Sequence, residues 1–426
     1  MTPEEAERQL LERELFGMRF GLDRMRRLMQ ELGQPQRRFR SIHVVGTNGK
    51  SSTTRMIAAI LSRHGLRVGS YLSPHLVSFN ERIRVGEDDI TPQQFAAAIE
   101  RALVAAAHVE RDAALEDRVT QFELLTAAGY WELARQEVEV AVIEAGLGGR
   151  YDATNVIPSS VQVLTGVGLE HTRWLGSTIE SIAREKLDVV QPAATLLLGA
   201  AMHPDAVAVA REVSAQRGAR IVFAQDDPHT PLGVRGLYQR RNFALARAAA
   251  AAFLGEAALD PAAVAAAALQ VRVPGRMEII DQRPLTVLDG AHNPDGMAAL
   301  TQSLPALISE TITAQSGGRV VAVVSILKDK DAAAMLAQLG AVCDALVLTV
   351  SRNPRVLSTA ELLSIFNGLD PKPLISCEVV GDAHLALARA RALAGEHGIA
   401  LATGSLYLVA ELARGPDDRP HPASMF

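Results

Sequence analysis

The chain has 426 residues, of which 48% are hydrophobic and 21% charged, and its formal net charge is −5. These values exclude a disordered chain and predict two or three domains with sizeable cores. The acidic balance argues against a nucleic-acid partner, and two cysteines, Cys343 and Cys377, are too few for a disulfide framework. No apolar run reaches the roughly 18 residues of a membrane span, and the N-terminus is acidic where a signal peptide is basic. We therefore expect a cytoplasmic protein with no nucleic-acid or membrane partner. A monomer is expected as well, although composition does not fix the oligomeric state.

Short apolar runs alternate with longer helical patterns along the first two thirds of the chain. Strands are predicted at 42–45, 138–143 and 161–165, and helices at 52–64, 178–190 and 242–254. Apolar strands that are buried on both faces and separated by helices are typical of a parallel sheet covered by helices on each side. The first part of the chain is therefore predicted to be an α/β domain with a mainly parallel sheet.

The same alternation restarts near residue 283. A strand at 285–288 precedes a polar loop and a helix that begins at Asp295, and further strands are predicted at 319–324, 345–350 and 399–403. The stretch 281–284 is polar and ends in proline, as a linker does. We therefore predict two α/β domains, residues 1–282 and a smaller one at 283–426.

A glycine-rich segment, Gly46-Thr47-Asn48-Gly49-Lys50-Ser51-Ser52-Thr53, follows the first strand and precedes a helix. Phosphate binding needs inward backbone N–H groups, glycines that let the backbone approach, and a cation. The spacing is a shortened Walker motif, because Val44 stands where the usual pattern has glycine. A simple turn with a surface lysine is the alternative, but the flanking strand and helix favour a nucleotide site.

Polar side chains that suit Mg²⁺ follow three of the predicted strands. Glu144 and His171 come after the strands 138–143 and 161–165, and Ser73 follows an apparent strand near residue 70. Each alone is most simply a loop or turn residue. Because ligands bind at the carboxyl ends of strands in open α/β sheets, the three residues together with a phosphate loop favour a magnesium site.

Nine segments resemble, in order, motifs of the Mur ligase superfamily and, within it, of folylpolyglutamate synthase/dihydrofolate synthase. They are residues 46–50, 73–76, 122–126, 144–155, 168–172, 274–276, 289–294, 329–331 and 403–407. The segments 73–76 and 144–155 favour the folate branch over the cell-wall branch. The resemblance implies a P-loop ATPase domain followed by a smaller Rossmann-like glutamate ligase domain.

The resemblance also implies a set of site residues. ATP contacts are expected from Asn48, Gly49, Lys50, Asn242, Arg276 and Asp289, and Mg²⁺ contacts from Ser73, Glu144 and His171. A further metal contact is expected from the hydroxyl of Ser51 or of Ser52, and the sequence leaves the choice open because both follow Lys50. Contacts to the pterin are expected from Asp23, Arg24 and Phe122, and contacts to glutamate from His292 and Ser405. Lys50, His292 and Lys186 are the expected catalytic groups, although His292 also fits a purely structural role in its loop.

Lys186 matches the position at which the family carries a carbamylated lysine. Reaction with CO₂ converts the cation into an anion that can bind a second Mg²⁺. An ordinary helix lysine is the alternative, and the chain departs from the family here, with Leu187-Asp188 where Ala-Gly is usual. A requirement for a monovalent cation is left open.

The predicted activity is ATP-dependent addition of L-glutamate to dihydropteroate, to folates or to both, through an acyl phosphate. One alternative is a related ligase of cell-wall precursors, but only about 40 residues precede the first strand, too few for an extra nucleotide-binding module. The other is a P-loop nucleotide switch that ligates nothing. A switch would not need a second domain with its own Asp289 and His292 loop.

Overall fold

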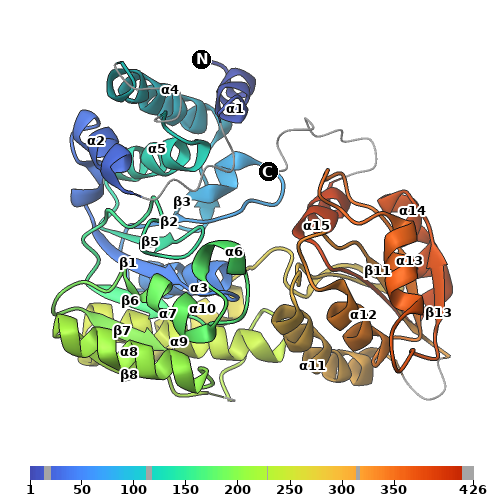
Figure 1. The fold of residues 1–426 in the computed structure, drawn as a ribbon. Coiled ribbons are helices and arrows are strands. Elements are labelled where there is room, and N and C mark those ends of the chain that lie inside the picture. Colours follow the sequence, from blue (N-terminus) through green and yellow to red (C-terminus); the bar gives the residue numbers. More distant parts are fainter. Residues whose placement is uncertain (14–20, 112–117, 228, 313–316, 415–426) are drawn as a thin grey trace. The chain divides into compact units, whose positions relative to one another are not determined.

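The protein consists of two compact units that are each built around one sheet (Figure 1). The computed structural model describes residues 1–13, 21–111, 118–227, 229–312 and 317–414. The first unit comprises residues 1–233 and 240–272, and the second comprises residues 234–239 and the chain from Val273 onward. The prediction of two mostly parallel α/β sheets is confirmed.

The first unit contains an eight-stranded sheet in the order β4-β3-β2-β5-β1-β6-β7-β8. The strands are β1 (Arg40–Val45), β2 (Val68–Tyr71), β3 (Ile83–Val85), β4 (Asp88–Asp89), β5 (Val140–Glu144), β6 (Val161–Leu164), β7 (Thr195–Leu198) and β8 (Arg220–Phe223). All neighbours from β2 to β8 in this order pair in parallel, and β3 pairs antiparallel with both β2 and β4. Because β1 lies between β5 and β6, the loops that follow these three strands emerge side by side at one edge.

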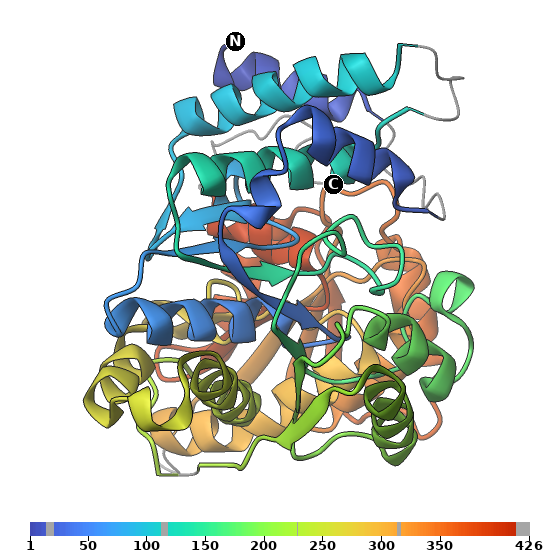
Figure 2. The ribbon, with the colours of Figure 1, turned by 90° about the vertical axis from the view of Figure 1, so that its left-hand side faces the viewer.

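Helices cover both faces of this sheet (Figure 2). They are α1 (Pro3–Leu11), α2 (Asp23–Glu31), α3 (Lys50–Arg63), α4 (Pro92–Val109), α5 (Gln121–Arg135), α6 (Thr172–Leu175), α7 (Ile179–Leu187), α8 (Pro204–Arg217), α9 (Leu237–Leu254) and α10 (Pro261–Gln270). Helices α4 and α5 share a core with Tyr71 and Ile143, and α7 and α8 share one with Val45 and Leu164. Helices α3 and α10 pack together on the opposite face.

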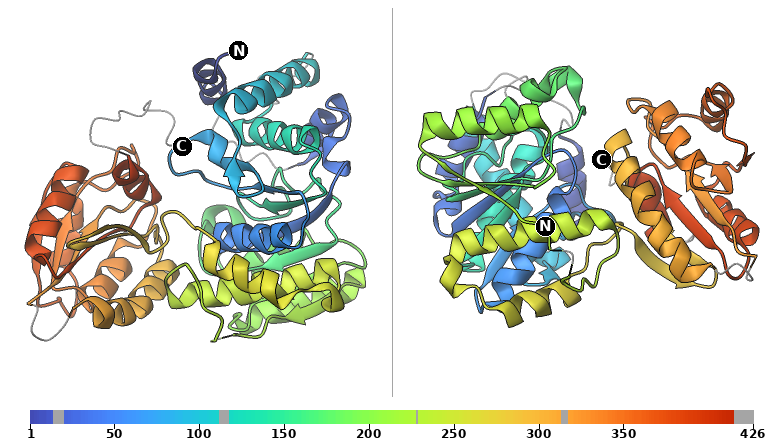
Figure 3. Two further views of the ribbon diagram at one scale, coloured as in Figure 1. Left: turned by 180° about the vertical axis from the view of Figure 1, so that it is seen from behind. Right: turned by 90° about the horizontal axis from the view of Figure 1, so that it is seen from below.

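The second unit contains a six-stranded sheet in the order β13-β12-β11-β14-β10-β9 (Figure 3). Its strands are β9 (Glu278–Gln282), β10 (Leu285–Leu288), β11 (Val320–Val324), β12 (Ala345–Leu348), β13 (Ser376–Val379) and β14 (Ile399–Thr403). Only β9 is antiparallel, and it pairs with β10. The predicted domain boundary at 283 therefore falls in the turn between two strands of this sheet.

The helices of the second unit are α11 (Pro294–Thr311), α12 (Ala332–Gly340), α13 (Thr359–Asn367), α14 (Ala383–Ala394) and α15 (Leu406–Ala413). Helices α11, α12 and α13 share one core with the sheet, and α14 packs against β11 and β14. In neither unit does a helix of the described ranges have the length and apolar character needed to cross a membrane.

Candidate active site

The phosphate loop, residues 46–49, connects β1 to α3 and requires glycine at its end. Gly49 has a φ of 86°, in the left-handed region that favours glycine. A Cβ on Gly49 would also lie 2.6 Å from Oδ1 of Asn242, so the side chain from α9 lies directly against the loop. The structure therefore brings Asn242 together with Asn48 and Lys50, three of the residues predicted to contact ATP.

The segment that follows β6 holds the phosphate loop in place. The backbone N–H of Thr47 donates to the Gly166 carbonyl at 2.8 Å, and the Gly168 N–H donates to the Thr47 hydroxyl at 3.0 Å. The Thr165 hydroxyl donates to the carbonyl of Asn48 at 2.6 Å. Sequence reasoning missed this support, because nothing in the local pattern of residues 165–168 shows that they contact a loop far away in the sequence.

Two lysines converge on the same backbone carbonyl. The ammonium of Lys50 donates to the carbonyls of Gly46 at 3.2 Å and Thr47 at 3.1 Å, and that of Lys186 donates to Gly46 at 2.8 Å. Lys186 is only 4% exposed. Burial, and then the charge of Lys50, lower the pKa of Lys186 to about 7. The phosphate loop therefore has two lysines beside it, one of which readily gives up its proton at neutral pH.

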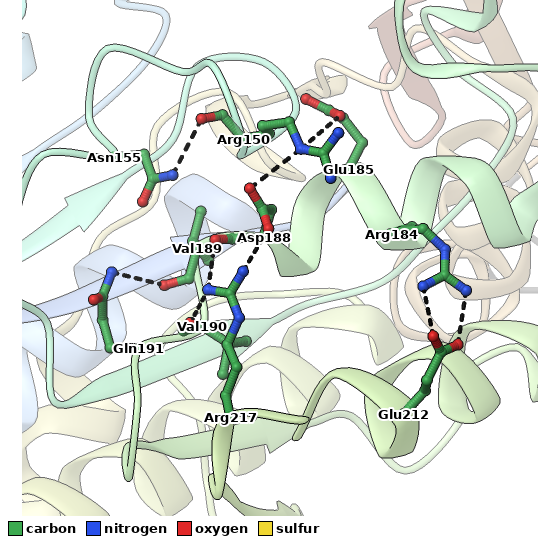
Figure 4. Close-up of polar contacts among 10 residues, drawn as sticks. All are labelled: Arg150, Asn155, Arg184, Glu185, Asp188, Val189, Val190, Gln191, Glu212 and Arg217. Carbon is green, nitrogen blue, oxygen red and sulfur yellow. Dashed lines mark hydrogen bonds and ion pairs between the residues drawn. The ribbon is translucent and has the colours of Figure 1, made fainter. Parts of the chain in front are cut away.

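Helix α7, which carries Lys186, is anchored by ion pairs (Figure 4). Arg184 binds both oxygens of Glu212 on α8, at 2.9 and 2.7 Å. One turn further on, the C-cap residue Asp188 accepts from Arg217 of α8 and from Arg150. These contacts fix the C-terminal end of α7, which carries Lys186, against α8 and the loop that follows β5.

A buried carboxylate lies at the carboxyl end of β5. Glu144 is 1% exposed, and its Oε1 accepts a hydrogen bond from the Ser51 hydroxyl at 2.8 Å. Its Oε2 accepts from the backbone N–H of Ser73 at 3.1 Å. The structure thus brings together Ser51, Ser73 and Glu144, three of the residues predicted to bind metal, from three separate segments. It also favours Ser51 over Ser52 as the hydroxyl next to this carboxylate.

The donor atoms around Glu144 fit Mg²⁺. This ion prefers oxygen ligands and typically binds one or two carboxylates together with phosphate oxygens. Glu144 and the hydroxyl of Ser51 would supply such oxygens beside the phosphate loop. His171 has a side chain that is 39% exposed, with Nε2 at 3.9 Å from Oε2 of Glu170. Within the described residues no group of three His, Cys, Asp or Glu side chains forms a metal cluster, so a role for His171 stays a prediction.

Two of the three residues predicted to bind the pterin lie close together. A Cβ on Gly146 would be 2.5 Å from the ring of Phe122, so this ring packs on the loop just after Glu144. Arg24 forms an ion pair with Glu123, the next residue of α5, with Nη2 and Oε1 3.2 Å apart. Asp23 is separate from this group, because its side chain is 87% exposed and pairs with Arg26.

In the second unit, Asp289 lies at the carboxyl end of β10. Its carboxylate accepts hydrogen bonds from the Tyr238 hydroxyl at 2.7 Å, the Met277 N–H at 2.9 Å and the Ala291 N–H at 2.9 Å. Burial raises the pKa of Asp289, and the positive charge of Arg276 opposes that rise. Asp289 therefore fixes the loop that follows β10 and lies near Arg276, and contact of these two residues with ATP stays a prediction.

The two residues predicted to bind glutamate lie on loops that touch. His292 Nδ1 is 2.8 Å from the carbonyl of Gly290, and the backbone N–H of Gly404 donates to the carbonyl of Ala291 at 3.0 Å. Ser405 follows directly and caps α15 by accepting from the N–H of Tyr407. Since a carbonyl only accepts hydrogen bonds, Nδ1 of His292 donates to the carbonyl of Gly290.

Comparisons with known proteins agree with this arrangement. Residues 275–406 match the glutamate ligase domain of the Mur ligases. The chain is 36% identical to the folylpolyglutamate synthase of Lacticaseibacillus casei over 80% of its own length and 84% of the relative. It is 30% identical to the dihydrofolate synthase/folylpolyglutamate synthase of Bacillus subtilis, over 94% and 95%. Among solved structures, the Mycobacterium tuberculosis folylpolyglutamate synthase complexed with ADP is 30% identical and superposes with a TM-score of 0.87, covering 97% of this chain and 99% of the other. Escherichia coli FolC in complex with DHPP and ADP is 28% identical, with a TM-score of 0.84 and 97% coverage of both chains.

Proposed function

The chain belongs to the folylpolyglutamate synthase/dihydrofolate synthase family, and on that premise we propose which of its residues carry the reaction. The enzyme is an ATP-dependent ligase that adds L-glutamate to folates. The observation that carries the proposal is the convergence of Lys50, Ser51 and Glu144 at one edge of the first sheet. We assign the phosphates of ATP and the acceptor to the first unit and glutamate to the second, in a monomer of the cytoplasm.

ATP binds, in this proposal, with its phosphates on the loop of residues 46–49. The N–H groups at the start of α3 and the Lys50 ammonium would surround the transferring phosphoryl group, where positioning and charge neutralisation supply most of the catalysis. Glu144 and the Ser51 hydroxyl would hold Mg²⁺, and Ser73 and His171 would complete its surroundings. When bound, the ion supplies charge neutralisation on the phosphate oxygens. Asn242, Arg276 and Asp289 would contact the nucleotide.

The acceptor presents a carboxylate, which is a poor electrophile until it is activated. One of its oxygens attacks the γ-phosphorus of ATP, ADP leaves, and an acyl phosphate forms. The pterin would lie against Phe122, near Arg24, because this ring already packs on the loop that follows Glu144. Holding the carboxylate next to the γ-phosphate turns a bimolecular step into one within a single complex.

L-Glutamate then attacks the acyl carbon through its amine, and inorganic phosphate leaves. The amine must lose a proton for this step, and we assign the role of proton acceptor to His292, whose ring is oriented by the bond from Nδ1 to the Gly290 carbonyl. The hydroxyl of Ser405 would bind a carboxylate of the incoming glutamate. His292 and Ser405 are thus proposed to orient the nucleophile.

Lys186 is proposed to be carbamylated. Carbamate formation requires a neutral amine, and burial beside Lys50 lowers the pKa of Lys186 to about 7, so much of it is neutral at physiological pH. The carbamate would add a negative charge beside the phosphate loop, suited to a second Mg²⁺. Enzyme equilibrated with ¹³C-labelled bicarbonate should show a carbamate signal in its NMR spectrum that is lost in Lys186→Arg. A spectrum without that signal would refute the assignment.

An acceptor screen tests the proposed function most simply. Purified protein with ATP, Mg²⁺ and L-glutamate is given dihydropteroate or tetrahydrofolate, and amide product and ADP are measured. We expect product with at least one acceptor, and ADP release that depends on both acceptor and glutamate. ADP release without either substrate would instead indicate a nucleotide switch, and product only with a cell-wall precursor would indicate the other branch of the superfamily.

A further inference from the structure

A fully buried histidine in β1 has no part in the reaction described above. His43 is in the middle of β1, is 0% exposed, and lies beside Ile143 of β5 and Gln162 of β6 in the register of the sheet. Burying an imidazole in a sheet core is costly unless its polar atoms are hydrogen bonded. Its contacts therefore need an explanation.

The direction of the hydrogen bond between His43 and Thr154 can be assigned. Nε2 of His43 is 2.9 Å from the Thr154 hydroxyl, which itself donates to Oδ1 of Asp152 at 2.5 Å. A hydroxyl has a single proton. Because that proton goes to the carboxylate, the hydroxyl accepts from His43, and Nε2 carries the hydrogen. Burial lowers the pKa of His43 to about 3, so the ring is neutral and Nε2–H is its only donor.

Asp152, at the end of this chain of hydrogen bonds, closes the 145–154 loop. Its Oδ2 accepts from the backbone N–H of Leu147 at 2.7 Å, and its Oδ1 also accepts from the N–H of Thr154 at 3.0 Å. From the other side, the Tyr130 hydroxyl donates to the carbonyl of Thr154 at 2.9 Å. The carboxylate thus links the start of the loop to its end, and His43 fixes the hydroxyl that orients it.

The 145–154 loop connects the groups proposed to act on the acceptor. It follows Glu144 directly, and its Gly146 packs against the ring of Phe122. A Cβ on Gly149 would be 2.5 Å from the carbonyl of Lys186, so the loop also packs on α7. At Gly146 and Gly149, a residue larger than glycine would collide with these neighbours. Because the loop packs this closely on Phe122, a shift of the loop would also shift the surface proposed for the acceptor.

We propose that His43 is a positioning residue: through Thr154 and Asp152 it holds the 145–154 loop in the conformation that receives the folate acceptor. The proposal rests on the placement of the acceptor at Phe122. His43 does not touch the reacting atoms. It acts through a donor of fixed direction, which a neutral histidine buried in a strand supplies and an apolar residue does not.

Variants of the full chain test this role. His43→Met keeps the volume and removes the donor, His43→Gln restores an N–H donor at a similar reach, and Thr154→Val removes the hydroxyl between His43 and Asp152. The matched control is Gln162→Met, because Gln162 is equally buried, neighbours His43 in the sheet and bonds only to Ser159. KM is measured for the folate, for ATP and for glutamate, together with kcat and the melting temperature.

We expect His43→Met and Thr154→Val to raise KM for the folate about tenfold, the size expected when one strong buried hydrogen bond is lost. KM for ATP should change less than about twofold, and His43→Gln should recover most of the folate affinity. Gln162→Met should lower the melting temperature without raising KM for the folate. The proposal is overturned if Gln162→Met raises that KM as much as His43→Met does, or if Thr154→Val leaves it unchanged.

A further variant separates this inference from the proposed acceptor site. Phe122→Leu should raise KM for the folate if the pterin lies on that ring. An unchanged KM in Phe122→Leu removes the proposed acceptor site. If KM for the folate is raised in Phe122→Leu but unchanged in His43→Met and Thr154→Val, the proposed acceptor site stands. The positioning role of His43 is then wrong. Should His43→Met fail to fold, Thr154→Val alone decides the result.

Discussion

The two buried carboxylates at the sheet edges, Glu144 in the first unit and Asp289 in the second, are used differently. Glu144 accepts from a hydroxyl that directly follows Lys50, whereas Asp289 accepts from two backbone N–H groups and a tyrosine that fix its own loop. Both follow a parallel strand, where ligands bind in such folds. The difference indicates that Glu144 is placed to meet a ligand of the phosphate loop, whereas Asp289 mainly fixes the loop that follows β10.

Removing the cation of the phosphate loop should have the largest effect. Lys50→Ala should lower kcat by about 1,000-fold, because the charge next to the transferring phosphoryl group is lost. Its melting temperature should stay close to that of the wild type, since the ammonium contacts only the carbonyls of its own loop. Lys372→Ala, which removes an exposed lysine of the second unit, is the control and should change neither value. A Lys50→Ala enzyme with more than a tenth of the normal kcat would contradict the account.

Substitutions at Glu144 and Asp289 test directly whether the two carboxylates have different roles. Glu144→Gln should lower kcat by about 100-fold and raise the Mg²⁺ concentration needed for half-maximal activity, with little change in melting temperature. Asp289→Asn should instead lower the melting temperature and raise KM for ATP, because the amide has a donor where the loop offers only donors. Activity titrated with Mg²⁺ and thermal melts measure both. If Asp289→Asn alone altered the Mg²⁺ dependence, the two roles would be reversed.

Substitutions at the two serines after Lys50 test which hydroxyl contributes to the proposed magnesium site of the first unit. Ser51→Ala should raise the Mg²⁺ requirement about tenfold, because its hydroxyl bonds to the buried carboxylate. Ser52→Ala is the matched control, one residue further along α3, and should leave the Mg²⁺ requirement unchanged. Equal effects of the two substitutions would remove the distinction between them.

A pH dependence of stability is also expected from the buried histidine of the first unit. The folded pKa of His43 is about 3, below the ordinary value of 6.5, so the unfolded chain binds more protons between these values. Stability should therefore fall as the pH decreases from 6.5 towards 3. None of the described strands of the second sheet contains a histidine. Thermal melts from pH 7 to pH 4 should show a smaller fall for His43→Gln, and identical slopes would contradict this.

The fold could be predicted largely from the sequence because its strands are short, apolar and buried on both faces. The strands at 285–288 and 399–403 were predicted at the bounds that the structure has. The stretch 281–284 resembled a linker, yet it contains the end of β9 and the turn into β10. An edge strand with exposed polar residues has no apolar run, so its sequence pattern does not distinguish it from a loop.

The site was less predictable where contacts join distant segments. Lys50, Ser51 and Glu144 could be predicted because each lies in a recognisable local sequence motif. The bond from His43 to Thr154 and the ion pair of Arg24 with Glu123 each join residues about a hundred positions apart, and no local pattern signals either contact. The best available signal was the presence of a histidine inside an apolar strand, because burying an imidazole is costly unless a ring nitrogen is hydrogen bonded.

Isotope transfer tests the central claim most directly, namely that ATP activates the carboxylate of the acceptor. The acceptor is prepared with ¹⁸O in both carboxylate oxygens and converted with unlabelled ATP and L-glutamate, and the inorganic phosphate is analysed by mass spectrometry. The account predicts one ¹⁸O atom in each phosphate released, since the oxygen that attacks the γ-phosphorus leaves with it. Phosphate without label, or label found in AMP, would contradict the account.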